Sequence, residues 1–381
     1  MINEFLERLK QHIDPFLMGC ISFACIVGLF VLYSASGGSI ERVFSQFLNI
    51  TAALVIMALA AHTSPHYLER IALPLFVVGL LLLIGVALFG EISHGARRWL
   101  NLGVGRIQPS ELMKIAVPMM LAWYFSKREQ SLRWGDYAIA ALLLVVPVGL
   151  IMKQPDLGTA LIVTAAGFYV LFLAGLSWKI LAGGALSIAV MAPIFWSLMH
   201  DYQRKRIEIL FDPYQDPLGA GYHTIQASIA LGSGGFAGKG WMNGTQSQLD
   251  FLPERTTDFI FAVFGEEFGF LGNALLLVLF LLLIGRGLVI ASQAQNTFTR
   301  LLAGSITLTF FTYVFVNMGM VSGILPVVGV PLPFVSYGGT SLVTILLGFG
   351  ILMSIHTHKT LMSTSLNLHT FLFQRYLVYC S

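Results

Sequence analysis

The densest group of polar residues in this mostly apolar chain lies between Gly244 and Gly269. A loop that contains Glu254 leads into Thr256-Thr257-Asp258, and a long apolar run follows. A threonine suits the N-cap of a helix, and the helix dipole favours an aspartate in the first turn. Asp258 is therefore either part of a helix cap or, beneath a loop rich in cations, a carboxylate available for acid–base chemistry.

Two further carboxylates, Glu266 and Glu267, follow in the same apolar run. At 1.5 Å per residue they lie roughly 12–14 Å beyond Asp258 along a helix. Carboxylates inside a membrane helix are costly and usually have partners. We expect a structural ion pair here rather than catalysis, with Lys114 or the hydroxyl-rich face of a neighbouring helix as the partner.

A second polar group precedes another apolar run. Pro109 directly after Gln108 predicts the start of a helix, and Lys114 falls five residues inside it. A lone lysine at this depth could extend its amine to the membrane surface. Together with Arg106, however, it would form a cationic mouth suited to a phosphate or diphosphate, and we favour this interpretation.

Two Pro- and Gly-containing turns, Lys153–Thr159 and Gly323–Gly339, are predicted to connect membrane spans on the same outer face. An architectural role suits most of their residues. Asp156 and Ser336 are candidate exceptions, because each is expected to start a helix that faces the same vestibule.

Two other motifs predict no site. Gly232–Gly240 is similar to a phosphate-binding loop, but Ser233 occupies the position of its first glycine and Gly240 that of its magnesium-binding hydroxyl residue. His356 and His358 are two residues apart at a helix end, which is a poor geometry for metal ligands. The sequence therefore predicts neither a nucleotide site nor a metal site.

The composition indicates what must position these residues. Of 381 residues, 56% are hydrophobic and 11% are charged, whereas soluble domains are roughly 25% charged. The net charge of +3 is too small to indicate nucleic-acid binding. The chain is therefore predicted to be an all-α integral membrane protein.

About 20 apolar residues are needed to cross a bilayer, and this length predicts ten spans. They are residues 15–35, 44–61, 69–89, 109–126, 137–152, 157–175, 178–199, 257–285, 301–322 and 337–356. Ten spans place both termini on one side, and the bias of basic residues makes that side the cytoplasm. Residues 1–362 are then one domain with a large outer loop at about 200–257, and the tail 363–381 has no assigned role.

At these motifs the chain resembles the SEDS (shape, elongation, division and sporulation) family. The matching motifs are Gly95–Trp99, Gln108–Lys114, Gln154–Thr159, Asp212-Pro213, Asp216–His223, Gly234–Gly240, Phe251–Ala262 and Gly323–Gly339. Gly244–Gln248 and Ser354–His358 resemble the elongation branch more than the division branch. The resemblance implies the SEDS fold, of about ten transmembrane helices with one large periplasmic loop, in the bacterial inner membrane.

The resemblance also implies an activity, the polymerisation of Lipid II (an undecaprenyl-pyrophosphate-linked disaccharide pentapeptide) by a peptidoglycan glycosyltransferase. Asp258 takes the position of the family's catalytic aspartate, and Arg106 and Lys114 take positions that matter for activity. The other substrate-binding candidates, all inside matching motifs, are Glu254, Asp156, Ser336 and Lys239.

In this interpretation Asp258 is the general base for the acceptor hydroxyl, and cations stabilise the departing diphosphate. No cofactor is certain, although a divalent cation would be compatible with the chemistry. The implied partner protein is a class B penicillin-binding protein. Two alternatives are a Lipid II flippase and a non-catalytic scaffold for that transpeptidase.

Overall fold

The computed structural model describes residues 12–93, 96–101, 106–128, 133–199, 201–219, 221–249, 251–252 and 254–358. The predicted tail 363–381 therefore lies outside the described residues.

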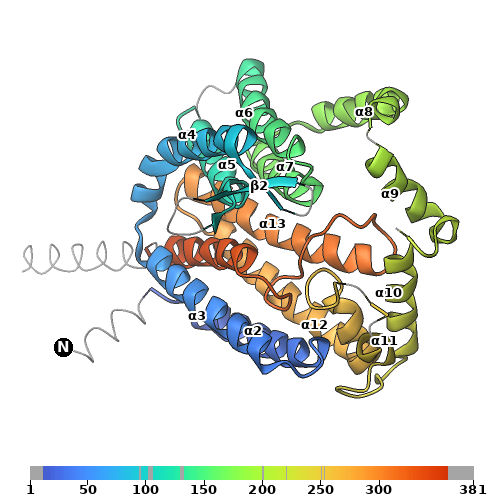
Figure 1. Cartoon of the computed structure of the whole chain (residues 1–381). Helices are drawn as coiled ribbons and strands as arrows, with labels where there is room; N and C mark the ends of the chain where they lie inside the picture. The colour runs from blue at the N-terminus through green and yellow to red at the C-terminus, as the bar shows by residue number, and fades with distance from the viewer. Residues whose placement is uncertain are drawn as a thin grey trace, which may run out of the picture.

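Each of the ten predicted spans corresponds to a helix (Figure 1). These helices are α2 (Pro15–Ala35), α3 (Ile40–His62), α4 (Pro65–Phe89), α5 (Pro109–Ser126), α6 (Trp134–Met152), α7 (Leu157–Leu173), α8 (Trp178–Leu198), α12 (Ile260–Ser292), α13 (Thr297–Val321) and a last helix, Thr340–His358. Seven of them are long and apolar enough to cross a membrane. Of the other three, α7 and the stretch Trp178–Ile194 of α8 are apolar but shorter, and α5 is the third. The all-α membrane fold predicted from composition is confirmed.

The starts of several helices follow from local sequence. α2 begins at Pro15, and the carboxylate of Asp14 accepts hydrogen bonds from the N–H groups of Phe16 (3.0 Å) and Leu17 (3.1 Å). α5 begins at Pro109, as predicted, because proline has no N–H and its φ angle already suits a first helical turn.

The centre of the bundle is α13, which packs against α5, α7 and α12 (Figure 1). Hydrogen bonds join it to α7: Ser305 Oγ donates to the carbonyl of Ala166 (2.7 Å), and the hydroxyls of Thr312 and Tyr169 lie 2.7 Å apart. In lipid, where burial of apolar surface gives little drive for association, close packing and such bonds hold helices together. α13 therefore provides a rigid wall for whatever lies beside it.

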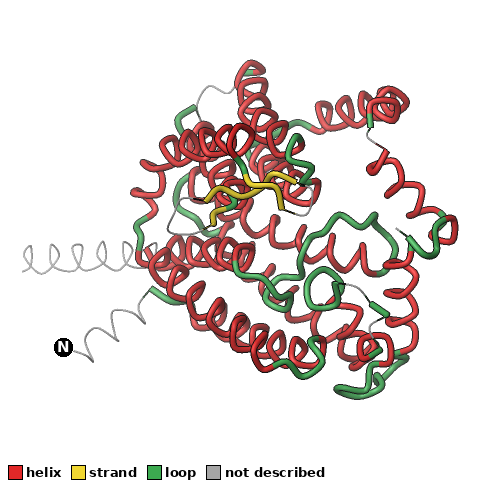
Figure 2. Tube along the Cα trace, viewed as in Figure 1, coloured by secondary structure: helices red, strands yellow, loops and turns green. Residues whose placement is uncertain are grey.

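The loops predicted to lie outside the membrane contain more secondary structure than the sequence predicted. The stretch after α4 forms a small antiparallel sheet of β1 (Glu91–Ser93), β2 (Ala96–Asn101) and β3 (Arg106–Ile107), in the order β1-β2-β3 (Figure 2). The long loop at 200–257 contains α9 (Asp201–Phe211), the 3-10 helix η1 (Pro213–Gln215), α10 (Tyr222–Ser233) and α11 (Thr245–Gln248). α10 packs along α12, so this part of the loop lies against the bundle.

Helix α12 is interrupted where the loop meets it. Gly269 has φ +65°, and a Cβ atom there would lie 2.3 Å from the N atom of Gly238. Around this break, backbone bonds between the helix and the loop replace bonds within the helix: Phe270 N donates to Gly235 O (2.9 Å) and Lys239 N to Glu266 O (3.0 Å). Only glycine combines this conformation with so close an approach.

Gly269→Ala is expected to lower the thermal stability of the detergent-solubilised protein. The methyl group requires a strained φ angle and displaces the segment at Gly238, at a cost of about 1–3 kcal/mol. Gly285→Ala is the matched control, because the same helix has open space beside Gly285. Equal melting temperatures for the two variants would contradict the role assigned to Gly269.

Candidate active site

A cavity of about 410 Å³ lies between α5, α7 and α13, under the segments that precede α12 and the last helix. Four of the residues singled out in the sequence line it: Lys114, Asp156, Asp258 and Ser336. They come from four separate parts of the chain, which the fold brings together.

Asp258 does not cap α12. The N-cap of this helix is Phe259, it has no side-chain capping bond, and the first turn contains no acidic residue. The interpretation of Asp258 as a first-turn residue is therefore wrong, because the chain turns for two further residues after Thr257 before the helix begins at Ile260. The carboxylate instead faces the cavity, where a Cβ atom added to Gly329 would be 3.4 Å from Asp258 Oδ2.

The surroundings of Asp258 raise its pKa. Burial is the largest cause, the negative charge of Glu254 adds to it and the positive charge of Arg206 opposes it, so that the pKa rises from 3.8 to about 6. Within the described residues its carboxylate has no hydrogen bond and no ion pair within 4 Å. Such a group is ionised at neutral pH and is basic enough to accept a proton from a bound hydroxyl.

On the α5 side, Lys114 supplies a buried cation. Its Nζ atom is 2.6 Å from Oε1 of Glu111 and 5.2 Å from the ring centre of Tyr313. Glu111 also accepts a hydrogen bond from Thr344 Oγ1 (3.1 Å), which holds the pair against the last helix. The pairing of Lys114 with Glu111, one helical turn away, was not predicted. It keeps the ammonium group at the cavity instead of at the membrane surface.

Asp156 is the N-cap of α7, as predicted, with Oδ1 accepting from the N–H of Thr159 (3.2 Å). Its other oxygen, Oδ2, accepts from Gln108 Nε2 (3.1 Å) and lies 4.0 Å from Nε of Arg98. Arg98 and Gln108 also line the cavity, although neither was predicted to be a site residue. The motifs Gly95–Trp99 and Gln108–Lys114, which contain these two residues, were the sequence signal that could have identified them.

Ser336 lies four residues before the last helix, so the expectation that it starts a helix is wrong. Its hydroxyl donates to the carbonyl of Thr257 (2.6 Å) and accepts from the N–H of Leu332 (2.8 Å). Tyr337 N also donates to Thr256 O (2.8 Å). The turn at Ser336 is thus tied to the turn that carries Asp258, and this geometry indicates a positioning role.

Two other predicted residues lie at the edge of the site. Glu254 is exposed and accepts from Thr257 Oγ1 (2.9 Å), and it acts on Asp258 through its charge. Arg106 lies on β3, and its side chain is outside the described part of the structure.

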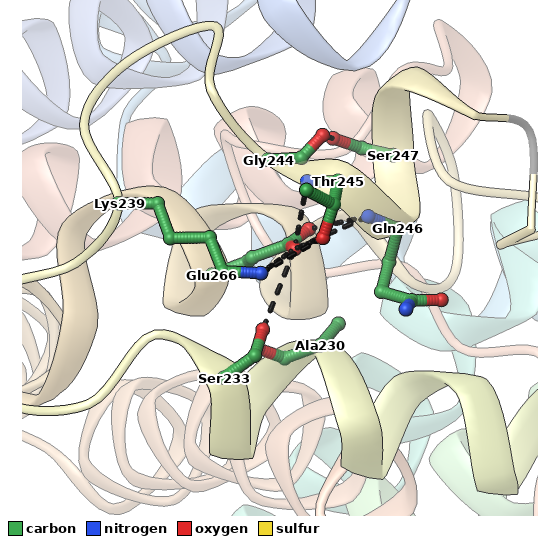
Figure 3. A network of polar contacts seen from close by, with 8 residues as sticks. All are labelled: Ala230, Ser233, Lys239, Gly244, Thr245, Gln246, Ser247 and Glu266. Carbon is green, nitrogen blue, oxygen red and sulfur yellow. Dashed lines mark hydrogen bonds and ion pairs between the residues drawn. The ribbon is translucent and has the colours of Figure 1, made fainter.

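Lys239 does not line the cavity, and its ammonium group forms an ion pair with Glu266, a fully buried residue (Figure 3). Oε1 of Glu266 lies 2.7 Å from Lys239 Nζ, 2.8 Å from Thr245 N and 3.1 Å from Gln246 N. The partner of Glu266 is therefore Lys239 and not Lys114, whereas the hydroxyl of Ser34 donates to Glu267. This network attaches the long loop to α12, and nothing in it supports the prediction that Lys239 binds substrate.

The arrangement pairs a basic carboxylate with a buried ammonium group in one cavity. Such a pair can remove a proton from a hydroxyl and stabilise an anionic leaving group. In the part of the chain that the structure describes, no group of three or more His, Cys, Asp or Glu residues could hold a metal ion.

Known proteins are similar to this chain over most of its length. Residues 15–361 match the family model of FtsW, RodA and SpoVE, described as cell cycle protein. The chain is 51% identical over 357 residues to peptidoglycan glycosyltransferase MrdB of Escherichia coli strain K12, covering 93% of this chain and 96% of that protein. It is 36% identical over 364 residues to a probable peptidoglycan glycosyltransferase FtsW of Geobacter sp. strain M18, with coverages of 92% and 98%.

Two solved structures are similar over 90% of the chain. One belongs to a peptidoglycan synthase complex that coordinates polymerization and crosslinking (TM-score 0.79, 34% identity, 97% of that chain). The other is the rod shape determining protein RodA of Thermus thermophilus (TM-score 0.68, 31% identity, 96% of that chain). The apolar helices together with these similarities indicate a multi-pass inner membrane protein. The chain belongs to the FtsW/RodA/SpoVE family.

Proposed function

We propose that this protein polymerises Lipid II into the glycan strands of peptidoglycan during cell elongation. Its relatives are named peptidoglycan glycosyltransferases. The observation that carries the proposal is the cavity itself, because it brings two charged groups to one small volume. They are the half-buried carboxylate of Asp258, which has no close partner among the described residues, and the buried ammonium group of Lys114.

The chemistry follows from these two groups. Asp258 accepts the proton of the acceptor sugar's 4-hydroxyl group. At the same time the oxygen of that hydroxyl group forms a bond to C1 of the donor sugar. The bond between C1 and the diphosphate oxygen breaks, and the diphosphate leaves with the electron pair of that bond. Lys114 stabilises the added negative charge. The donor carries its own leaving group, so the reaction needs no nucleotide, and direct displacement inverts C1.

The cavity would open to the periplasm, with both termini of the chain in the cytoplasm. The bias of basic residues toward the opposite loops supports this orientation. A class B penicillin-binding protein would take the nascent strands as a transpeptidase. The similar chain in a peptidoglycan synthase complex supports that partnership.

Asp258→Asn is expected to abolish glycan polymerisation from purified Lipid II, with the partner transpeptidase supplied to every reaction. The amide keeps the size of the side chain but cannot accept the proton, so a rate loss of about 10²–10⁴-fold is expected. Asp212→Asn is the control and should polymerise normally, because Asp212 caps η1 in the long loop and does not line the cavity. Normal polymer from Asp258→Asn would refute the catalytic assignment, and no polymer from wild type would favour a flippase or a scaffold.

The rate should also depend on pH through Asp258. Because burial raises its pKa to about 6, the carboxylate becomes protonated and inactive below that value. kcat/KM should therefore be flat near neutral pH and fall about tenfold per unit below about pH 6. If kcat/KM fell only near the ordinary pKa of an aspartate, or did not fall at low pH, the base would be another group or would not be buried.

A double-mutant cycle separates a structural from a substrate-binding role of Lys239. We expect Lys239→Met and Glu266→Gln each to lower the melting temperature and to be coupled by about 0.5–3 kcal/mol. The KM for Lipid II should stay unchanged in folded Lys239→Met. A raised KM without loss of stability would instead favour contact between Lys239 and the substrate.

A further inference from the structure

Asn317 is a fully buried polar residue on α13, in the wall of the bundle behind the cavity. Its Nδ2 atom donates to two backbone carbonyls, those of Asp258 (2.9 Å) and Val330 (2.7 Å). A side-chain amide has two N–H donors, and both are used here. Its Oδ1 atom has no hydrogen-bond partner in the described part of the chain, so the contacts of this amide are donations from Nδ2.

The carbonyl of Asp258 needs this partner because the start of α12 is irregular. In a continuous α-helix the N–H of Ala262 would donate to the carbonyl four residues earlier, which is that of Asp258. It donates instead to Phe259 O (2.9 Å). Asn317 therefore takes the place of a helical hydrogen bond at the residue that carries the reactive carboxylate.

The second carbonyl belongs to a segment that lies beside that carboxylate. Val330 follows Gly329, which has φ +74° and whose Cβ position would be 3.4 Å from Asp258 Oδ2. Val330 and Gly329 both line the cavity. One amide group thus joins the backbone of Asp258 to the segment beside its carboxylate, and it does so from the central helix α13.

We propose that Asn317 is a positioning residue for the transfer reaction, which sets the orientation of the Asp258 carboxylate by clamping its backbone to the Val330 segment. This inference rests on the proposed function. It does not make Asn317 a catalytic residue, because its side chain acts through the backbone and is not part of the cavity lining.

The test is steady-state polymerisation by Asn317→Ala and Asn317→Ser, beside wild type and Asp258→Asn, with the partner transpeptidase present. Loss of both donors in Asn317→Ala should lower kcat about 10- to 100-fold, with KM for Lipid II within about threefold of wild type. Asn317→Ser keeps one donor on a shorter side chain and should be intermediate. It also serves as the working variant if Asn317→Ala does not fold.

The pH profile gives a readout that general destabilisation would not move. A loosened Asp258 becomes more hydrated, so its pKa falls toward the ordinary value and the acidic limb of residual activity should move below about pH 6. Ser305→Ala is the matched control. It removes another buried hydrogen bond from α13 to a carbonyl of a different segment, twelve residues from Asn317.

Ser305→Ala should keep the wild-type kcat and acidic limb even if its melting temperature drops. The proposal is overturned if Asn317 variants keep the wild-type kcat. It is also overturned if they lose activity and stability together while the acidic limb of the pH profile stays where it is in wild type, as expected for a purely structural residue. Failure of the proposed function itself is seen separately, as absence of polymer from wild type or normal polymer from Asp258→Asn.

Discussion

Irregular backbone at the cavity is the constraint on which the rest of this structure depends. Asp258 lies in a turn outside α12, and the chain before the last helix is also neither helix nor strand. Inside a membrane protein such backbone persists only where protein groups satisfy its N–H and C=O groups. Ser336, Tyr337 and the central helix α13 supply those partners. The turn can therefore hold a carboxylate in a cavity, where a regular helix start would have used it as a cap.

The polar pairs in and near the site fall into two groups with different structural roles. Lys114 with Glu111 and Asp156 with Gln108 lie in the cavity wall, while Glu266 with Lys239 attaches the long loop to α12. Asp258 differs from all of them because it has no close partner among the described residues. A paired carboxylate is a weak base, so this isolation is what keeps Asp258 available for proton transfer.

Much of this could be predicted from the sequence, because lipid demands long apolar helices and those are easy to recognise. All ten predicted spans became helices, and the motifs led to Asp258, Lys114 and Asp156. The partner of Glu266 could not be predicted, since it depends on how a loop folds back onto α12. The start of α12 was also missed, because Thr256-Thr257-Asp258 suits a helix cap equally well. Asn317 gave only the weak signal of a polar residue in an apolar helix.

The most direct measurement is a structure of the Asp258→Asn variant with Lipid II bound, in which the inactive enzyme retains its intact substrate. The account predicts the diphosphate beside Lys114 and the sugar ring in the cavity, next to residue 258. Lipid II bound with its diphosphate and sugar outside this cavity would contradict the account.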